Sequence, residues 1–527
     1  MIVVTCISKI RGSNNNIIGY VLEDKAGFRK TVNASELKSN IQNGKVWFLN
    51  LKLTTDNRLV DCDNGNNSEN EISNIAAYKK YMTKAAVIGS PFDFEVDEKQ
   101  GEITITKARL NGKSFVEIPS FVTRIKPCVL LEEVDDISML KIVYKGNKLT
   151  TLRGVFSDSM GGVIGVLDLS EFNLQGVVDM SRAFSKCLAM EIKVNWKSAD
   201  SLINISNMFD SCTWLENVDL SELKLRRIRN MSGLFCNCMR LKNINFGNQK
   251  FNKENYDISR VFCGCQGLRT IDTKAFSGVS ILKAESTFEN CISLEKIDLS
   301  PMTMYNILYT EKMFRGDESL REIVYGNMNT HAVRNMNYMF EGCRNLEYID
   351  TTNHIIIRSA DSVTNLFSGC LKLKEIDLSN WDTKGVYEWY GMFSNCVSLT
   401  KIDFARCKTD KASTFENLFD GCINLKTVIM IRCNVPNLTN IKGMFRNCKS
   451  IEKINLSSFK ARGVKLFNEA FVGCDSLKYL NTGSMELDSS AVLDLVNIQR
   501  LFTKKAERKT ELKVVGKDPK ILMQSRR

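Results

Sequence analysis

Apolar residues recur along most of this chain with a fixed period. The recurring pattern is Phe-x-x-Cys-x-x-Leu-x-x-Ile-Asp-Leu-Ser, and its clearest copy runs from Phe288 to Ser300. Twelve phenylalanines carry it at intervals of 25 to 27 residues: Phe184, Phe209, Phe235, Phe262, Phe288, Phe314, Phe340, Phe367, Phe393, Phe419, Phe445 and Phe471. Eleven of the twelve copies have cysteine three residues later, and the exception is Asp317. A period of this length is typical of a solenoid in which each repeat forms one coil.

The second half of each repeat predicts one short strand. In the clearest copy, Leu294, Ile297 and Leu299 alternate with Lys296 and Asp298. Because successive side chains of a strand point to opposite faces, we expect the apolar set to point inward and the polar set outward. Strands stack about 4.8 Å apart, so twelve coils predict a parallel sheet roughly 58 Å long. The fold class expected is therefore a repeat solenoid with one short parallel strand per coil.

These copies resemble the BspA-like leucine-rich repeat proteins, in the variant whose units read Met-Phe-x-x-Cys-x-x-Leu-x-x-Ile-Asp-Leu-Ser-x-Trp-Asp-Thr. Residues 392–399 and 377–383 match that unit almost letter for letter, and residues 118–125 resemble the Ile-Pro-x-x-Val-x-x-Ile segment of the same family. The resemblance implies a solenoid used for binding, often at bacterial or parasite surfaces.

The segments outside the repeats have a different character. Residues 1–62 predict a small α+β module with a hairpin around Asp24 to Gly27, a helix near residues 34–42 and later strands at 46–53 and 58–62. Residues 63–114 read as a linker followed by a helix and strand segment. The solenoid is expected over residues 115–482. A helix over 483–502 would cap its open end, and residues 503–527 form a basic tail.

Charge and composition narrow the function classes. The 527 residues carry a net charge of +12, and residues 502–527 supply half of it, with nine Lys or Arg against three Asp or Glu. Only two histidines occur, and no glycine-rich nucleotide loop, nucleophile elbow or zinc-protease motif is present, so we expect neither an enzyme nor a cofactor.

The location is predicted from what the N-terminus and the apolar runs contain. No apolar stretch approaches the roughly 18 residues that a membrane helix needs, and the first ten residues do not read as a secretory signal. We therefore expect a cytoplasmic location by default, with the 18 cysteines reduced. A cell-surface location is what the family resemblance implies.

The outward positions of the predicted strands are the candidate partner-binding surface on the concave face. They combine charged side chains with two tyrosines, whose large area is suited to anchoring a partner. The candidate residues are Lys296, Asp298, Tyr348, Asp350, Glu375, Asp377, Lys401, Asp403, Lys453 and Tyr479. Variable side chains that are merely solvated are the alternative interpretation. The partner expected is a protein or a glycan.

An acidic column runs along the same face. Aspartate recurs at residues 219, 272, 298, 350, 377 and 403, with asparagine in register at 245, 455 and 481. Calcium binding is one interpretation; the other is that each Asp accepts hydrogen bonds from Ser, Thr or backbone groups of the neighbouring coil. Either way, the column argues against nucleic acid on this face and leaves the basic tail as the candidate for it.

The cysteine column is interpreted as structural, because a small buried side chain fits a tight turn that recurs in every coil. Cys236, Cys238, Cys263 and Cys265 form two Cys-x-Cys pairs on adjacent coils, and they are a candidate zinc site. Residues two apart often face different ways, which favours the structural interpretation for these four as well.

Three functional hypotheses follow. In the first, the solenoid is a non-enzymatic binding protein that holds its partner on the concave face. In the second, the chain is an effector or regulator whose N-terminal module or basic tail acts while the repeats select the target. In the third, it is a surface adhesin exported by a route that the sequence does not reveal.

Overall fold

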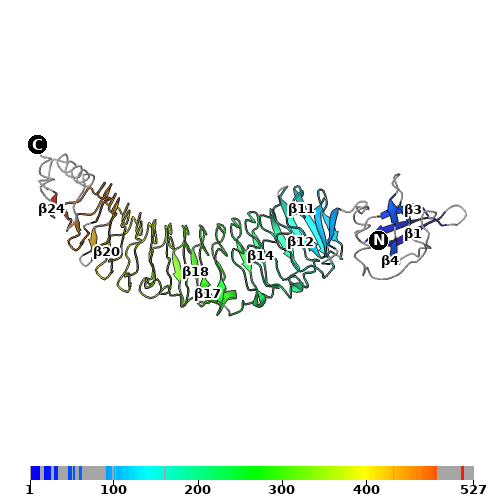
Figure 1. Ribbon diagram of the computed structural model, residues 1–527, viewed down its shortest axis with the longest axis horizontal. Coiled ribbons are helices and arrows are strands. Elements are labelled where there is room, and N and C mark those ends of the chain that lie inside the picture. Colours follow the sequence, from blue (N-terminus) through cyan, green and yellow to red (C-terminus); the bar gives the residue numbers. More distant parts are fainter. Residues whose placement is uncertain are drawn as a thin grey trace. The chain divides into compact units, whose positions relative to one another are not determined.

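The computed structural model of the protein describes residues 91–483, apart from 98–99, 101, 121, 160–161, 254, 431–432 and 462, together with 512–515 and six strands between residues 2 and 61. The chain divides into two compact units, residues 1–227 and 228–527. Each unit is described by itself. Figure 1 shows the coils of each unit stacked in chain order.

The first unit opens with antiparallel strands. They are β1 (Ile2–Arg11), β2 (Ile17–Asp24), β3 (Arg29–Asn33), β4 (Val46–Leu49), β5 (Leu51–Leu53) and β6 (Leu59–Asp61). Four of them form a sheet in the order β3-β2-β1-β4, and β5 pairs with β6. Strands β2 and β3 form the predicted hairpin. The helix predicted near residues 34–42 and the one predicted in 63–114 lie outside the described residues.

Parallel pairing begins in the next part of the first unit. Its elements are β7 (Phe92–Asp97), β8 (Glu102–Ala108), β9 (Phe115–Ile118), β10 (Arg124–Ile125), β11 (Ile137–Tyr144), β12 (Ile164–Leu169), β13 (Ala189–Val194), β14 (Asn217–Asp219) and the 3-10 turns η2 (Trp196–Ser198) and η3 (Leu225–Arg227). Strands β9, β11, β12 and β13 are parallel neighbours in a four-stranded sheet. Parallel pairing begins before Phe115, because β10 already pairs in parallel with β8, with Arg124 opposite Thr104.

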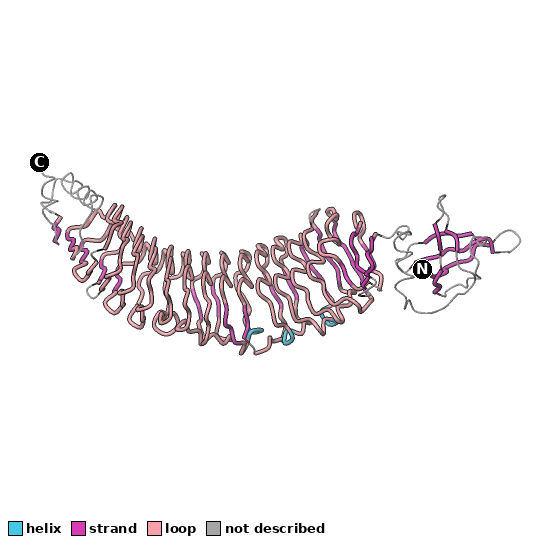
Figure 2. The backbone as a smooth tube through the Cα atoms, in the orientation of Figure 1, coloured by secondary structure: helices cyan, strands magenta, loops and turns pink. Residues whose placement is uncertain are grey.

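The second unit consists of coils with very short strands. They are β15 (Asn243–Asn245), β16 (Asn255–Asp257), β17 (Ser280–Lys283), β18 (Lys296–Asp298), β19 (Glu322–Val324), β20 (Lys401–Asp403), β21 (Thr427–Ile429), β22 (Lys453–Asn455), β23 (Tyr479–Asn481) and β24 (Lys513–Val515), with the 3-10 turn η4 (Lys274–Phe276). Their pairings are parallel. Figure 2 shows that loops make up most of each coil. The predicted solenoid is confirmed, although the coils at Tyr348 and Glu375 contain no regular strand.

The inward positions are those that the repeat predicts. Leu294, Ile297 and Leu299 are buried, whereas Lys296 and Asp298 are exposed. The repeat phenylalanines stack into a spine, with ring centroids of successive coils 5.4 Å apart from Phe156 to Phe209 and 5.5 to 6.2 Å apart from Phe235 to Phe471. Offset rings at this spacing gain packing energy beyond their buried area.

The repeat cysteines form a hydrogen-bonded ladder beside this spine. Nine of them donate to the carbonyl oxygen of the phenylalanine one coil earlier, at 3.0 to 3.2 Å, as Cys291 does to Phe262. These thiols are buried, and burial raises their pKa, as it does for Cys370. The prediction of a structural role is confirmed for them, since each satisfies a backbone acceptor that water cannot reach.

Backbone conformation explains why asparagine or glycine precedes most of the repeat cysteines. The residues two before and two after each repeat phenylalanine have positive φ, as Gly233 and Asn237 do around Phe235. Glycine and asparagine tolerate this left-handed conformation best. The Asn-Cys and Gly-Cys pairs of the repeats therefore mark a tight turn on either side of the spine.

The end of the second unit differs from the expected division into cap and tail. Strand β24 lies parallel to β23, with Tyr479 opposite Lys513 and Asn481 opposite Val515. Residues 513–515 thus extend the strand ladder, although the sequence places them in the basic tail. The capping helix predicted over residues 483–502 and the rest of the tail lie outside the described residues.

Candidate partner-binding surface

The outward side chains of the second unit's strand ladder form the surface that we call the strand face. It comprises Lys296, Asp298, Glu322, Tyr348, Asp350, Glu375, Asp377, Lys401, Asp403, Lys453 and Tyr479, so all ten predicted site residues lie in one unit. Central residues Ile297, Ile402 and Ile454 of strands β18, β20 and β22 are buried beneath it. A fixed apolar floor therefore holds the polar side chains at the pitch of the coils.

Part of the strand face is already engaged in contacts between coils. Lys296 Nζ lies 2.6 Å from Glu322 Oε1, and Lys453 Nζ lies 5.0 Å from the centre of the Tyr479 ring. Among the described residues, neither Glu375 nor Lys401 forms an ion pair with a side chain. The charges of Glu375 and Lys401, in the middle of the strand face, are therefore available to a partner.

Tyr348 is the most accessible large side chain of this middle part. It is 63% exposed, the highest value among the exposed large hydrophobic and aromatic residues of the described chain. Loss of hydration raises its pKa, and the nearby carboxylates Asp350, Asp377 and Glu375 raise it further. The ring thus stands among three negative charges, an arrangement suited to a cationic group.

The acidic column serves first as a set of turn caps. Asp298 Oδ1 accepts a hydrogen bond from the Ser300 amide at 2.8 Å, and Asp377 Oδ1 accepts one from the Ser379 amide at 2.8 Å. Asn455 does the same for the Ser457 amide at 3.1 Å. The expected hydrogen bonds therefore exist, but their donors lie two residues later in the same coil and not in the neighbouring coil. This explains why asparagine substitutes for aspartate in the column.

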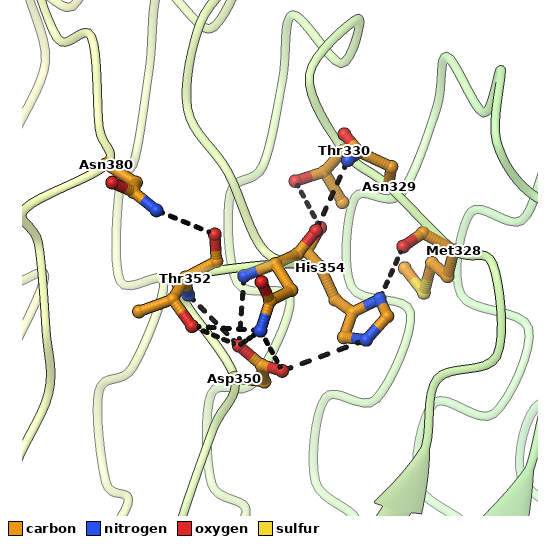
Figure 3. Close-up of polar contacts among 8 residues, drawn as sticks. Met328, Asn329, Thr330, Asp350, Thr352, His354 and Asn380 are labelled. Carbon is orange, nitrogen blue, oxygen red and sulfur yellow. Dashed lines mark hydrogen bonds and ion pairs between the residues drawn. The ribbon is translucent and has the colours of Figure 1, made fainter.

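The Tyr348 coil continues into a segment that is fixed by polar contacts (Figure 3). Asp350 Oδ1 accepts hydrogen bonds from the amides of Thr352 and Asn353 at 3.1 and 3.0 Å. Partial burial opposes ionisation of Asp350, but the hydrogen bonds from Asn353 and Thr352 outweigh it and its pKa is lowered. The ionised carboxylate thus lies in a rigid loop next to Tyr348.

His354 anchors this loop to the previous coil. Its Nδ1 lies 2.8 Å from the Met328 carbonyl oxygen, and its Nε2 lies 3.7 Å from Asp350 Oδ2. The Tyr325 ring stacks on the imidazole with centroids 5.0 Å apart. The sequence analysis missed this cluster; its signal is the eight-residue segment 350–357, where the Asp-Leu-Ser unit is replaced by Asp-Thr-Thr-Asn-His and an isoleucine run.

Among the described residues, the four cysteines of the zinc hypothesis do not form a metal-binding cluster. Cys238 and Cys265 occupy the buried ladder, where Cys265 donates to the Phe235 carbonyl oxygen at 3.1 Å. Cys236 and Cys263 precede them by two residues and contact Arg260 and Glu289 instead. Within the described part of the chain, no group of three or more His, Cys, Asp or Glu side chains is placed to hold a metal ion.

Among solved structures, this chain is similar to several leucine-rich repeat proteins. One is from Bacteroides ovatus, with 16% identity, coverage of 75% of this chain and 98% of that one, and a TM-score of 0.34. A leucine rich cell surface protein from Faecalibacterium prausnitzii has 14% identity, coverage of 82% and 95%, and a TM-score of 0.32. The pneumococcal vaccine antigen PcpA has 13% identity, coverage of 81% and 96%, and a TM-score of 0.32.

A family model also matches the repeats. Its description is "Mycoplasma protein of unknown function, DUF285", and it matches residues 150–276, 282–404 and 398–513, more than half of the chain. The chain belongs to this family. The third DUF285 match ends at the first residue of β24, so the family's extent includes the segment that follows the last phenylalanine repeat. No curated protein matches the chain.

None of the described helices is long and apolar enough to cross a membrane. The ten site residues selected from the sequence of this DUF285 chain lie along one ladder of the second unit. Their functional role is still a prediction.

Proposed function

We propose that this DUF285 chain is a non-enzymatic binding protein whose strand face holds a protein or glycan partner, with repeats of the BspA-like kind as its scaffold. The observation that supports the proposal most is Tyr348, which is 63% exposed on an otherwise well-packed ladder. An exposed aromatic side chain on a rigid support loses little conformational entropy on binding, which is why such residues dominate binding energies.

The charges around Tyr348 support a partner with cationic groups. Asp350, Asp377 and Glu375 all act electrostatically on its phenol. Lys401 lies one coil beyond Glu375, so the surface changes sign over a short distance and fits one orientation of a partner better than the reverse.

Affinity capture from source-cell lysate tests the proposal. The bait is the full chain, compared with a triple variant of the strand face, Tyr348→Ala, Lys401→Ala and Tyr479→Ala. The matched control removes two other exposed tyrosines and a lysine, Tyr305→Ala, Tyr387→Ala and Lys411→Ala. A partner retained by the native chain and the control but lost by the triple variant is the expected result. Equal capture by all three chains would contradict the proposal.

Two further measurements separate the other hypotheses. Deletion of residues 1–110 should leave partner capture intact if the strand face binds, and should abolish the biological effect if the N-terminal module acts. Cleavage of the protein by protease added to intact cells would support the surface hypothesis alone.

A further inference from the structure

Two cysteines outside the buried ladder lie side by side on adjacent coils. Cys236 and Cys263 each follow a repeat phenylalanine directly, and the rings of Phe235 and Phe262 stack with centroids 6.0 Å apart. The backbones are joined at this point, since Phe235 N donates to the Val261 oxygen at 2.9 Å and Asn237 N to the Cys263 oxygen at 2.6 Å. The two thiols interact, and the hydrogen bond to Cys236 is the largest cause of the raised pKa of Cys263. Neighbouring strands about 4.8 Å apart lie within the Cα separation that a disulfide bridges.

Charged groups surround this thiol pair. The Arg260 guanidinium donates to Cys236 Sγ at 3.2 Å, and Cys263 Sγ lies 4.0 Å from Glu289 Oε2. A guanidinium beside a sulfur stabilises its thiolate form. The hydrogen bond to Cys236 and then burial raise the pKa of Cys263, which makes Cys263 the proton donor of the pair.

Two neighbouring ladder cysteines, Cys265 and Cys291, are held differently from this pair. Cys265 and Cys291 donate their thiol protons to the carbonyl oxygens of Phe235 and Phe262, at 3.1 and 3.0 Å, and are fully buried. Cys236 is as buried as these ladder thiols, but Cys263 beside it is 9% exposed, so a small oxidant approaches the pair from the Cys263 side. Thiol reactivity also requires a route to the thiolate, which the Arg260 guanidinium provides at Cys236.

We propose that Cys236 and Cys263 are a redox-active pair that forms a disulfide between adjacent coils when the chain meets a peroxide. The Cys236 thiolate, stabilised by the Arg260 guanidinium, attacks the peroxide while Cys263 keeps its proton. A sulfur–oxygen bond forms, the oxygen–oxygen bond breaks, and the released hydroxide becomes water by taking a proton from solvent. The Cys263 sulfur then attacks the sulfenic acid on Cys236, the sulfur–sulfur bond forms, and a second water leaves with the Cys263 proton. Two sulfurs together lose two electrons and the peroxide gains them.

Arg260 is the positioning residue of this reaction. It lies two residues before Phe262 on the same coil as Cys263, and it reaches back to Cys236 on the previous coil. Its charge stabilises the attacking thiolate of Cys236, so its removal should slow disulfide formation while leaving both thiols in place.

Peptide mapping of the full reduced chain tests the proposal. The folded protein is treated with hydrogen peroxide, blocked with an alkylating agent, digested without reductant and analysed by mass spectrometry. We expect one dominant linked pair, which joins the Cys236 and Cys263 peptides with the loss of two hydrogens. Cys263→Ser should abolish it, whereas Cys265→Ser, which changes the ladder cysteine two residues later, should retain it. Arg260→Gln should slow its formation several-fold, and Arg269→Gln, an exposed arginine of the same coil, should not.

Two results would overturn the proposal, and the peptide map of the unsubstituted chain detects both. One is dominant linkage between ladder cysteines. The other is oxidation of Cys236 to sulfinic acid with no linked peptide. Native rates in Arg260→Gln would contradict the role of the guanidinium.

Discussion

The Asp317 carboxylate accepts a hydrogen bond from the Cys291 amide, with Oδ1 2.8 Å from the nitrogen, in the interior of the second unit. Asp317 occupies the ladder position that cysteine holds in the other repeats, and it is fully buried. Its Oδ2 has no hydrogen-bond partner among the described residues. Burial raises the pKa of Asp317 well above its ordinary value of 3.8. The repeat at Phe314 is therefore the weak point of the ladder.

Replacing this carboxyl should stabilise the protein. Asp317→Asn keeps the acceptor for Cys291 and adds a donor that can meet the Phe288 carbonyl oxygen, as the ladder thiols do. We expect a gain of about 1 to 3 kcal/mol in the free energy of unfolding at pH 8, since a buried group without a partner has a cost of that size. Urea denaturation of both chains measures it.

The stability gained by Asp317→Asn should increase as pH rises. Below pH 3.8 the carboxyl is protonated in both states and Asp317 has no ionisation cost. As pH rises, the unfolded chain ionises first, because the folded pKa is higher, so the native chain loses stability relative to Asp317→Asn until the folded pKa is passed. The advantage of Asp317→Asn should therefore be larger at pH 8 than at pH 4. The surface control Asp298→Asn should show no such increase, and a pH-independent gain at position 317 would contradict the assignment of a raised pKa.

Residues with positive φ allow a test of backbone strain in the coils. Arg182 is exposed and has φ of 56°, at the position where Gly233, Gly391 and Gly443 occur in other coils. Arg182→Gly should raise the free energy of unfolding by up to about 1 kcal/mol, because relief of the left-handed strain exceeds the entropy that glycine adds to the unfolded chain. Arg153→Gly, an exposed position without positive φ, should lower it. Thermal unfolding of both variants measures these changes. A loss of stability in Arg182→Gly would contradict the strain argument.

The acidic column can be tested for its role as a set of turn caps. Asp377→Ala removes the acceptor for the Ser379 amide and should cost about 1 kcal/mol, whereas Asp377→Asn should cost little, since asparagine fills this column naturally at residues 245, 455 and 481. Calcium should leave the melting temperature of all three chains unchanged. A calcium-dependent rise in the native chain, lost in Asp377→Asn, would instead support a cation site.

Much of the fold is predictable from the sequence because one coil repeats. The alternation of Leu294, Lys296, Ile297 and Asp298 sets which side chains are buried, and the stacking of identical coils puts every phenylalanine next to another. The same regularity predicts a structural role for the cysteine column, because a site for one ligand would not recur in every coil.

The features that escaped prediction are those that depend on contacts far apart in the sequence or on backbone angles. Strand β24 follows the last phenylalanine repeat by some 40 residues, and its three residues carry no repeat motif. The His354 loop depends on contacts with Met328 and Tyr325 in the preceding coil. The direction of Cys236 relative to Cys238 depends on the positive φ of Asn237 between them, which the Asn-Cys and Gly-Cys pairs signal without fixing.

The measurement that tests the strand face most directly is a tyrosine footprint of the full chain with and without its captured partner. Exposed tyrosines are iodinated under native conditions, and each site is quantified by mass spectrometry. The account predicts that the partner protects the exposed Tyr348 and the half-buried Tyr479, while Tyr305, Tyr309 and Tyr387, which are exposed elsewhere, keep their labelling. Protection of Tyr387 or Tyr309 with Tyr348 still fully labelled would place the partner on another surface and contradict the account.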